Sequence, residues 1–225
     1  MGELLVRGHA EAWVHPGRAV LDVTATARDP QTQRGAVEQL AGLCERVDEA
    51  VEERRDGRGG VVRRVVVSSI TTAEDVEYGP GGQRRRVGFS AVRTTRIECV
   101  ADADGLTDLL GALVHDDVQV RGPRWKVDDD DPAWLGVRTA AVADARRRAE
   151  AYALAVDGQV GAVRWIAEPG VRDGGEPPGP PHGGAAIRLA SAPAGDDGDG
   201  TRTVRVAVEP VRVAVAIEAA FDLRP

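Results

Sequence analysis

The sequence predicts an α+β fold with mixed, largely antiparallel sheets and helices packed on one face. Long segments near both ends alternate apolar and polar residues, which is typical of half-buried strands. Two Asp-Pro pairs, Asp29-Pro30 and Asp131-Pro132, each precede an apolar stripe at helical spacing. The strands come in groups before and after the helices, and this order favours antiparallel pairing over strand-helix-strand alternation.

The first two strands are predicted at residues 4–14 and 19–27. Each shows period-two alternation, and His15-Pro16-Gly17 between them has the composition of a turn, so the two are expected to form a hairpin. The helix after Asp29-Pro30 carries apolar residues at spacings of three and four up to Val51, and it should end near Asp56-Gly57.

The middle of the chain predicts a strand over about 61–78, a glycine-rich loop at 79–82 and a returning strand over 84–101. Arg93 and Thr95 interrupt the apolar face of the returning strand, which indicates a bulge or a change of environment. A short helix with leucines at 106, 109, 110 and 113 follows, and then a fifth strand over 118–127.

The last third begins with the longest predicted helix, from Pro132 to about Val156, whose stripe is mostly alanine and suits close packing on a sheet. A strand is predicted at 163–168, and the cleanest alternation in the chain, at 211–223, returns the C-terminus to a sheet. Residues 1–169 and 203–225 are therefore expected to form one domain, with two interleaved subdomains as an open alternative. Residues 170–202, rich in Gly, Pro and Asp, are expected to be a flexible loop.

The order of several motifs resembles the SIMPL-domain family. These motifs are Val6-Arg7-Gly8-His9-Ala10-Glu11, Arg28-Asp29-Pro30, Gly88-Phe89-Ser90-Ala91, and the helix 140–153 followed by Gly158 and Gly161. The resemblance covers nearly the whole chain except 170–202. The resemblance implies mixed sheets with packed helices, no known catalytic residues, and homo-oligomers in some members. It also implies export, because bacterial members of the family are often exported.

Composition narrows the functional classes. The net charge of the 225-residue chain is -7, which argues against nucleic-acid binding because phosphate contacts need a basic surface. No apolar run has the length of a membrane span. The start at Met1 shows no signal peptide, so the cytoplasm is the expected location, with export as the alternative if the natural N-terminus was trimmed.

The sequence shows no motif typical of a metal-binding, phosphate-binding or catalytic site. The four histidines and two cysteines lack metal-ligand spacing, no glycine loop fits a phosphate, and no serine sits in a nucleophile elbow. The aspartate run 128–131 lacks calcium-loop spacing, and Asp131 fits a helix cap better. We therefore expect no catalytic, cofactor-binding or metal-binding residues.

The sequence does offer candidate interface residues. They are Trp13, Trp125 and Trp134, since tryptophan on a polar face is typical of interfaces, and the basic run Arg84, Arg85 and Arg86, with Arg63 and Arg64 expected across the hairpin. Burial of the tryptophans under the long loop is an equally good explanation. We expect a non-catalytic scaffold or adaptor that forms homo-oligomers or binds a protein partner. The alternative is a small-ligand-binding module with loop 170–202 as its lid.

Overall fold

A computed structural model describes residues 2–55, 60–169 and 205–225. These residues form three helices and eight strands in antiparallel sheets, which confirms the predicted α+β class. The chain divides into two compact units. The described residues of the first are 2–15, 127–169 and 210–225, and those of the second are 16–55, 60–126 and 205–209. The predicted loop 170–202 lies outside the described residues.

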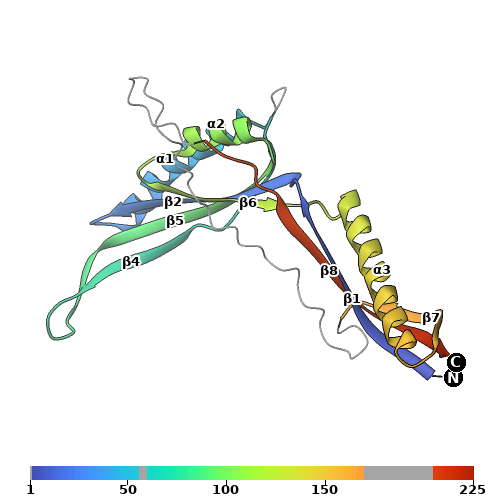
Figure 1. Ribbon diagram of the computed structural model, residues 1–225. Helices are drawn as coiled ribbons and strands as arrows, with labels where there is room; N and C mark the ends of the chain where they lie inside the picture. Colours follow the sequence, from blue (N-terminus) through green and yellow to red (C-terminus); the bar gives the residue numbers. More distant parts are fainter. Residues whose placement is uncertain (1, 56–59, 170–204) are drawn as a thin grey trace, which may run out of the picture. The chain divides into compact units, whose positions relative to one another are not determined.

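The first unit is a three-stranded antiparallel sheet covered by one helix (Figure 1). Its elements are β1 (Gly2–Val14), α3 (Pro132–Leu154), β7 (Gln159–Ala167) and β8 (Val211–Arg224), and the strand order is β1-β8-β7. Strands β1 and β8 pair continuously from Gly2 opposite Leu223 to Val14 opposite Val211. The two ends of the chain therefore close one sheet.

The predicted hairpin between the first two strands is wrong. Strand β1 pairs with β8, whereas β2 (Arg18–Asp29) belongs to the sheet of the second unit. Alternation identifies a strand and its inward face, but it cannot identify the neighbour. The strongly alternating C-terminal strand competes for β1 and matches it along its full length.

Helix α3 packs on this sheet through small side chains. Ala141, Ala145 and Ala149 are fully buried against Val6 and Phe221 of the sheet. The closest approach is at Gly8 of β1, where an added Cβ would lie 2.0 Å from the backbone oxygen of Ala141. Only glycine leaves room for the helix backbone at this point.

The second unit is a five-stranded antiparallel sheet with two helices on one face (Figure 1). Strand order is β3-β5-β2-β6, and β4 also pairs with β5, along the same edge as β3. The remaining elements are α1 (Gln33–Glu52), β3 (Val62–Val67), β4 (Thr71–Tyr78), β5 (Arg84–Val100), α2 (Ala103–Leu113) and β6 (Val118–Lys126).

Strands β3 and β4 correct the prediction of one strand over 61–78. The segment between them, 68–70, is not in a strand, because the pairing with β5 shifts there by one residue. Val67 lies opposite Thr95 and Thr71 opposite Val92. Arg93 of β5 lies at this break, so the irregularity that the sequence indicates near Arg93 and Thr95 coincides with a change of register along this edge.

Arg93 ties β5 to α1 across an otherwise apolar layer. Its Nη2 and Nη1 donate to the Asp48 carboxylate at 2.6 and 2.9 Å, and Nη2 also donates to the Cys44 carbonyl at 3.4 Å. The neighbouring Thr95 is buried as well. Charge-assisted bidentate pairing offsets the cost of placing the guanidinium in the core.

The helix starts follow the predicted chemistry with one adjustment. Asp131 caps α3, its Oδ1 accepting from the Ala133 N–H at 2.8 Å, as expected. At α1 the cap is Thr32, three residues after Asp29, and its Oγ1 accepts from the Gly35 N–H at 3.0 Å. Asp29 instead organises the preceding turn by accepting from the N–H groups of Gln31 and Thr32.

Substitution of Gly8 by alanine tests the close packing of α3 on β1. We expect Gly8→Ala to lower the free energy of unfolding by about 1–3 kcal/mol, because the helix must shift outward to admit a methyl group. Urea denaturation followed by circular dichroism measures the effect. Gly136→Ala in the same helix, which meets no atom within 4 Å, is the control and should stabilise by about 0.5–1 kcal/mol. Equal stability of Gly8→Ala and wild type would contradict the close contact.

Candidate functional site

The three tryptophans predicted at an interface occupy different environments. Trp13 is exposed on β1, opposite Arg212 of β8. Trp125 packs, partly buried, against the core of the second unit. Trp134 belongs to the start of α3, where its Nε1 donates to the Asp128 carbonyl at 2.9 Å and its ring lies 5.9 Å from the Arg138 guanidinium. Of the three, only Trp13 presents its ring broadly to the surface.

The predicted basic run lies on the β4–β5 hairpin, and acidic residues of β4 accompany it. Arg84 pairs with Glu74 at 3.2 Å and Arg85 with Glu77 at 3.1 Å. The Arg86 guanidinium lies 5.0 Å from the centre of the Phe89 ring. The expected partners across the hairpin, Arg63 and Arg64, lie instead in β3, beside residues 98 and 99 of β5. The hairpin surface therefore carries mixed charge.

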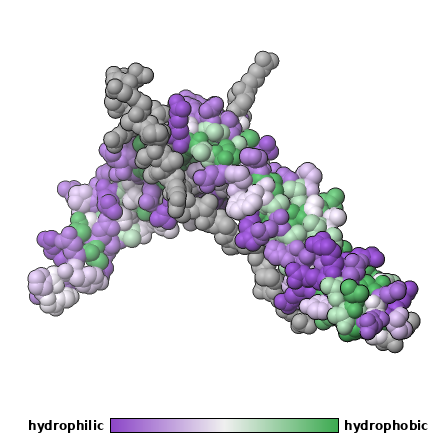
Figure 2. Space-filling view, in the orientation of Figure 1, coloured by the Kyte–Doolittle hydropathy of each residue, from purple (hydrophilic) through white to green (hydrophobic). Residues whose placement is uncertain are grey.

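The first unit has an uncovered apolar region on β7. Val163 and Ile166 lie opposite Phe221 and Ala219, so both are on the sheet face that α3 covers. They nevertheless remain 44% and 46% exposed. We call Val163 and Ile166 the β7 surface. Figure 2 shows apolar surface interspersed with hydrophilic residues over α3 and β7.

The position of α3 explains the exposure of the β7 surface. The helix approaches β1 most closely, at Gly8, and Asp144 on α3 accepts a hydrogen bond from the His9 backbone N–H at 3.0 Å. That contact satisfies an N–H on the free edge of β1. Because α3 lies toward β1, it leaves the other edge strand, β7, incompletely covered.

The Asp144 carboxylate accepts hydrogen bonds from three groups, the His9 backbone N–H and the guanidinium groups of Arg147 and Arg148. The His9 N–H is the largest influence that lowers the pKa of Asp144, and Arg148 and Arg147 lower it further at 2.8 and 2.9 Å. Desolvation opposes them but is outweighed. The residue is therefore a structural anion that fixes the helix on the edge strand.

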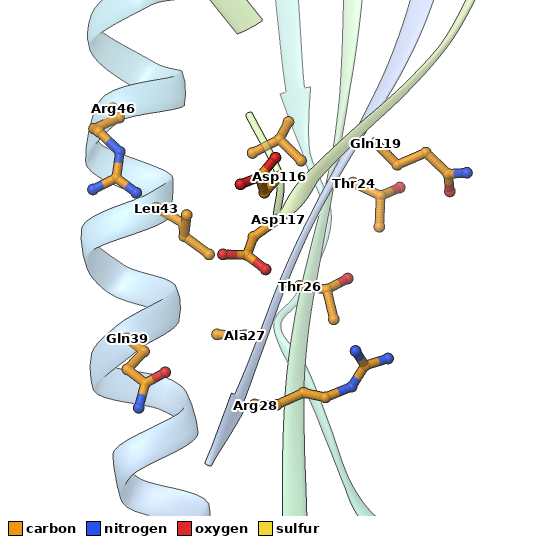
Figure 3. A pocket seen from close by; sticks show the side chains of 11 residues that line it. Thr24, Thr26, Ala27, Arg28, Gln39, Leu43, Arg46, Asp116, Asp117 and Gln119 are labelled. Atoms are coloured by element: carbon orange, nitrogen blue, oxygen red, sulfur yellow. The ribbon is translucent and has the colours of Figure 1, made fainter. Parts of the chain in front are cut away.

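The second unit contains a polar hollow of about 640 Å³ beside the end of β2 (Figure 3). Strand β2 pairs with β5 up to Asp29 but with β6 only up to Ala25, so its last residues lack a strand neighbour on one side. Gln39, Leu43 and Arg46 of α1 line one wall, and Asp117 lies across from them.

The hollow contains charges of both signs. Arg46, Asp116 and Asp117 form no ion pair with any described residue. Threonine hydroxyls at 24 and 26 and the amides of Gln39 and Gln119 add neutral donors and acceptors. This arrangement can hydrogen-bond a small polar ligand that carries both charges.

The remaining reactive side chains have structural surroundings. Burial raises the pKa of the Cys99 thiol to about 12 and also raises that of Cys44, so both are protonated at neutral pH. Within the described part of the chain, no three His, Cys, Asp or Glu side chains gather as a metal site would require. Among the same residues, no helix is long and apolar enough to cross a membrane.

A family model named SIMPL, described as a protein of unknown function (DUF541), matches residues 4–219. The chain belongs to the SIMPL family. The match spans both units and confirms the resemblance drawn from the motif order. No curated protein matches this SIMPL chain.

Sequence reasoning missed the residues that define the β7 surface of this SIMPL chain. Val163 and Ile166 are an odd number of positions apart yet share a face, because the pairing of β7 with β8 shifts near Val163 and Trp165. A register shift breaks the period-two rule, so no sequence pattern marks the pair. Asp144 could have been suspected as an acidic residue next to the buried alanine stripe of α3.

Replacement of Asp144 by asparagine tests the helix-to-edge contact through pH. The folded-state pKa lies below the usual 3.8, so the carboxylate contributes stability above that value and loses it as pH falls through the folded-state pKa. Asp144→Asn should be less stable at neutral pH and should lose less stability on acidification. Urea midpoints measured from neutral pH downward check this. Glu49→Gln, an exposed carboxylate on α1, gives the background effect, and identical pH slopes for Asp144→Asn and wild type would contradict the assignment.

Proposed function

We propose that this SIMPL chain is a non-catalytic scaffold or adaptor that assembles with copies of itself. The observation that carries the proposal is the β7 surface, where two β-branched apolar side chains stay half-exposed on an edge strand. Cytoplasmic residence is part of the same proposal.

An edge strand with apolar flanks is a surface that a protein must cover or protect. Unpaired N–H and C=O groups on an edge invite another strand, and proteins usually block such edges with charge, proline or a covering helix. In the first unit α3 protects the β1 edge through Asp144, whereas β7 pairs only with β8 among the described strands. Association of a second chain at β7 would bury Val163 and Ile166.

The non-catalytic part of the proposal is supported by the family resemblance, which implies no known catalytic residues. The ion pairs of the described residues also support it, because several of them join one element of the fold to another. Examples are Asp22 between Arg96 and Arg124, at 2.9 and 2.7 Å, and Asp48 with Arg93.

Light scattering coupled to size-exclusion chromatography tests the assembly. We expect the wild-type chain to elute with a mass above that of one copy. The double variant Val163→Asp/Ile166→Asp should shift toward the monomer, because carboxylates on the β7 surface oppose burial. Val114→Asp, at an exposed apolar position in the second unit, is the matched control and should not change the mass. A wild-type chain that stays monomeric at every concentration would refute self-assembly.

The hollow beside β2 favours a second candidate function, the binding of a small polar ligand. Arg46 and Asp117 face it from opposite walls without ion-pair partners among the described residues, so a ligand with an anionic and a cationic group could pair with both. The residues that line the hollow would form this site by themselves.

A thermal-shift screen with free amino acids and dipeptides tests this second candidate. A ligand that binds only the folded chain raises the melting temperature with concentration. We expect Arg46→Ala to abolish that increase, while Arg34→Ala, an exposed arginine elsewhere on α1, should retain it. An increase of the same size in wild type and Arg46→Ala would exclude the hollow as the site.

A further inference from the structure

Strands β3 and β4 form one continuous outer edge of the second unit's sheet. Both pair with β5 in the same direction, and no other described strand pairs with them. The edge is largely exposed and includes three apolar residues at the junction of the strands, Val66, Val67 and Ile70, which are 44%, 51% and 51% exposed. A free edge of this length is a template for another strand.

The two halves of this edge carry opposite charge. Strand β3 contributes Arg63 and Arg64, which form no ion pair with any described residue. Strand β4 contributes Glu74, Asp75 and Glu77. Glu74 and Glu77 pair with Arg84 and Arg85. Asp75 accepts from the Ser90 hydroxyl at 2.8 Å and lies 3.7 Å from the Arg28 guanidinium, but all three carboxylate side chains remain partly exposed.

The charge pattern selects one way of pairing two identical edges. If β3 met β3, the arginines of both copies would lie together, and if β4 met β4, the carboxylates would. Like charges directly opposite each other destabilise a strand pair, whereas opposite charges stabilise it. Only β3 against β4 of a second copy brings arginines to carboxylates, and this arrangement has two-fold symmetry.

The backbone allows the same arrangement. The Ser68 N–H donates to the Thr94 carbonyl at 2.9 Å, so by alternation Val65 and Val67 direct their N–H and C=O groups outward. In β4, Thr71 lies opposite Val92, two residues before Thr94, so Thr71 also bonds inward. Alternation then points Thr72 and Glu74 outward.

The register is symmetric about Arg93 of β5. Val67 and Val65 lie opposite positions 95 and 97, whereas Thr72 and Glu74 lie opposite 91 and 89, at the same distances on the other side. A two-fold axis at this point places Val67 opposite Thr72 and Val65 opposite Glu74 of the second copy. Two pairs, each occurring twice, give about eight backbone hydrogen bonds.

The same register brings the opposite charges together. Arg64 and Asp75 lie opposite positions 98 and 88 of β5, each five residues from the symmetry point, and both face the side of the sheet away from α1. They would occupy a non-hydrogen-bonded pair, the type with the closer side chains. Val66 would lie opposite Ala73, and the exposed apolar residues would be buried around the axis.

We infer that the β3–β4 edge pairs antiparallel with the same edge of a second copy, so that Arg64 of each chain contacts Asp75 of the other. The inference rests on the proposed self-assembly and adds its partner, register and symmetry for one contact. This contact is separate in sequence and unit from the β7 surface.

Complementary charge reversals test the pairing. In Arg64→Asp both contacts of the dimer become Asp with Asp, and in Asp75→Arg both become Arg with Arg, so each variant alone should lose this association. An equimolar mixture should form a heterodimer, because each chain then offers the charge that the other lacks. Analytical ultracentrifugation of the separate and mixed variants measures this, with Val163→Asp/Ile166→Asp present in every chain so that association through the β7 surface does not contribute. Arg55→Asp, a charge reversal outside the edge, is the control and should associate as wild type does.

Failure of the mixture to associate, with both variants folded by circular dichroism, would overturn the inference. Amide hydrogen exchange of the wild-type chain is a second readout that requires no substitution. The Val65 and Val67 N–H groups should become protected as concentration rises through the association range. Fast exchange of both amides in a sample that light scattering shows to be oligomeric would also overturn the inference while leaving self-assembly through β7 intact. A chain that is monomeric throughout would refute both.

Discussion

The close contact of α3 with β1 determines what the first unit can offer to a partner. At Gly8 the helix backbone lies where a side chain would otherwise be, and Asp144 holds the neighbouring N–H of His9. Both interactions draw the helix toward one edge of a three-stranded sheet. A single helix cannot cover that edge and also the far strand, so Val163 and Ile166 stay half-exposed. The proposed assembly surface is thus a consequence of how tightly the opposite edge is closed.

In the second unit an ion pair joins helix α1 to the sheet, and the β3–β4 edge pairs with no other described strand. Arg93 crosses from β5 to Asp48 of α1, and the pairing along the outer edge changes register at the same position of β5. That shift separates β3 from β4 and gives the edge two halves of opposite charge. Charge on an edge strand normally prevents promiscuous pairing, but here it also specifies a single complementary partner. One feature can therefore suppress aggregation and direct assembly.

The two candidate functions use different parts of the chain and are compatible. Assembly involves strand edges, whereas the hollow lies between the end of β2 and the turn before β6, lined by Arg46 and Asp117. Cys44 and Cys99 are buried, and burial raises the pKa of both thiols. The charged side chains whose pKa values are shifted, such as Asp144 and Asp22, mostly form hydrogen bonds and ion pairs that hold the fold together.

The sequence by itself determined the class of fold, most of the strands and helices, the inward face of most of them and the family. Those properties follow from local periodicity and capping, such as the alanine stripe of α3 and the Asp131 cap. Tertiary structure decided which strands are neighbours, because alternation in β1 suits β2 and β8 equally well and only full-length register distinguishes them. It also decided the candidate surfaces. Val163 and Ile166 share a face through register shifts, and Arg64 and Asp75 become symmetric only when β5 sets their positions. Both depend on pairing between distant segments, which no local pattern encodes.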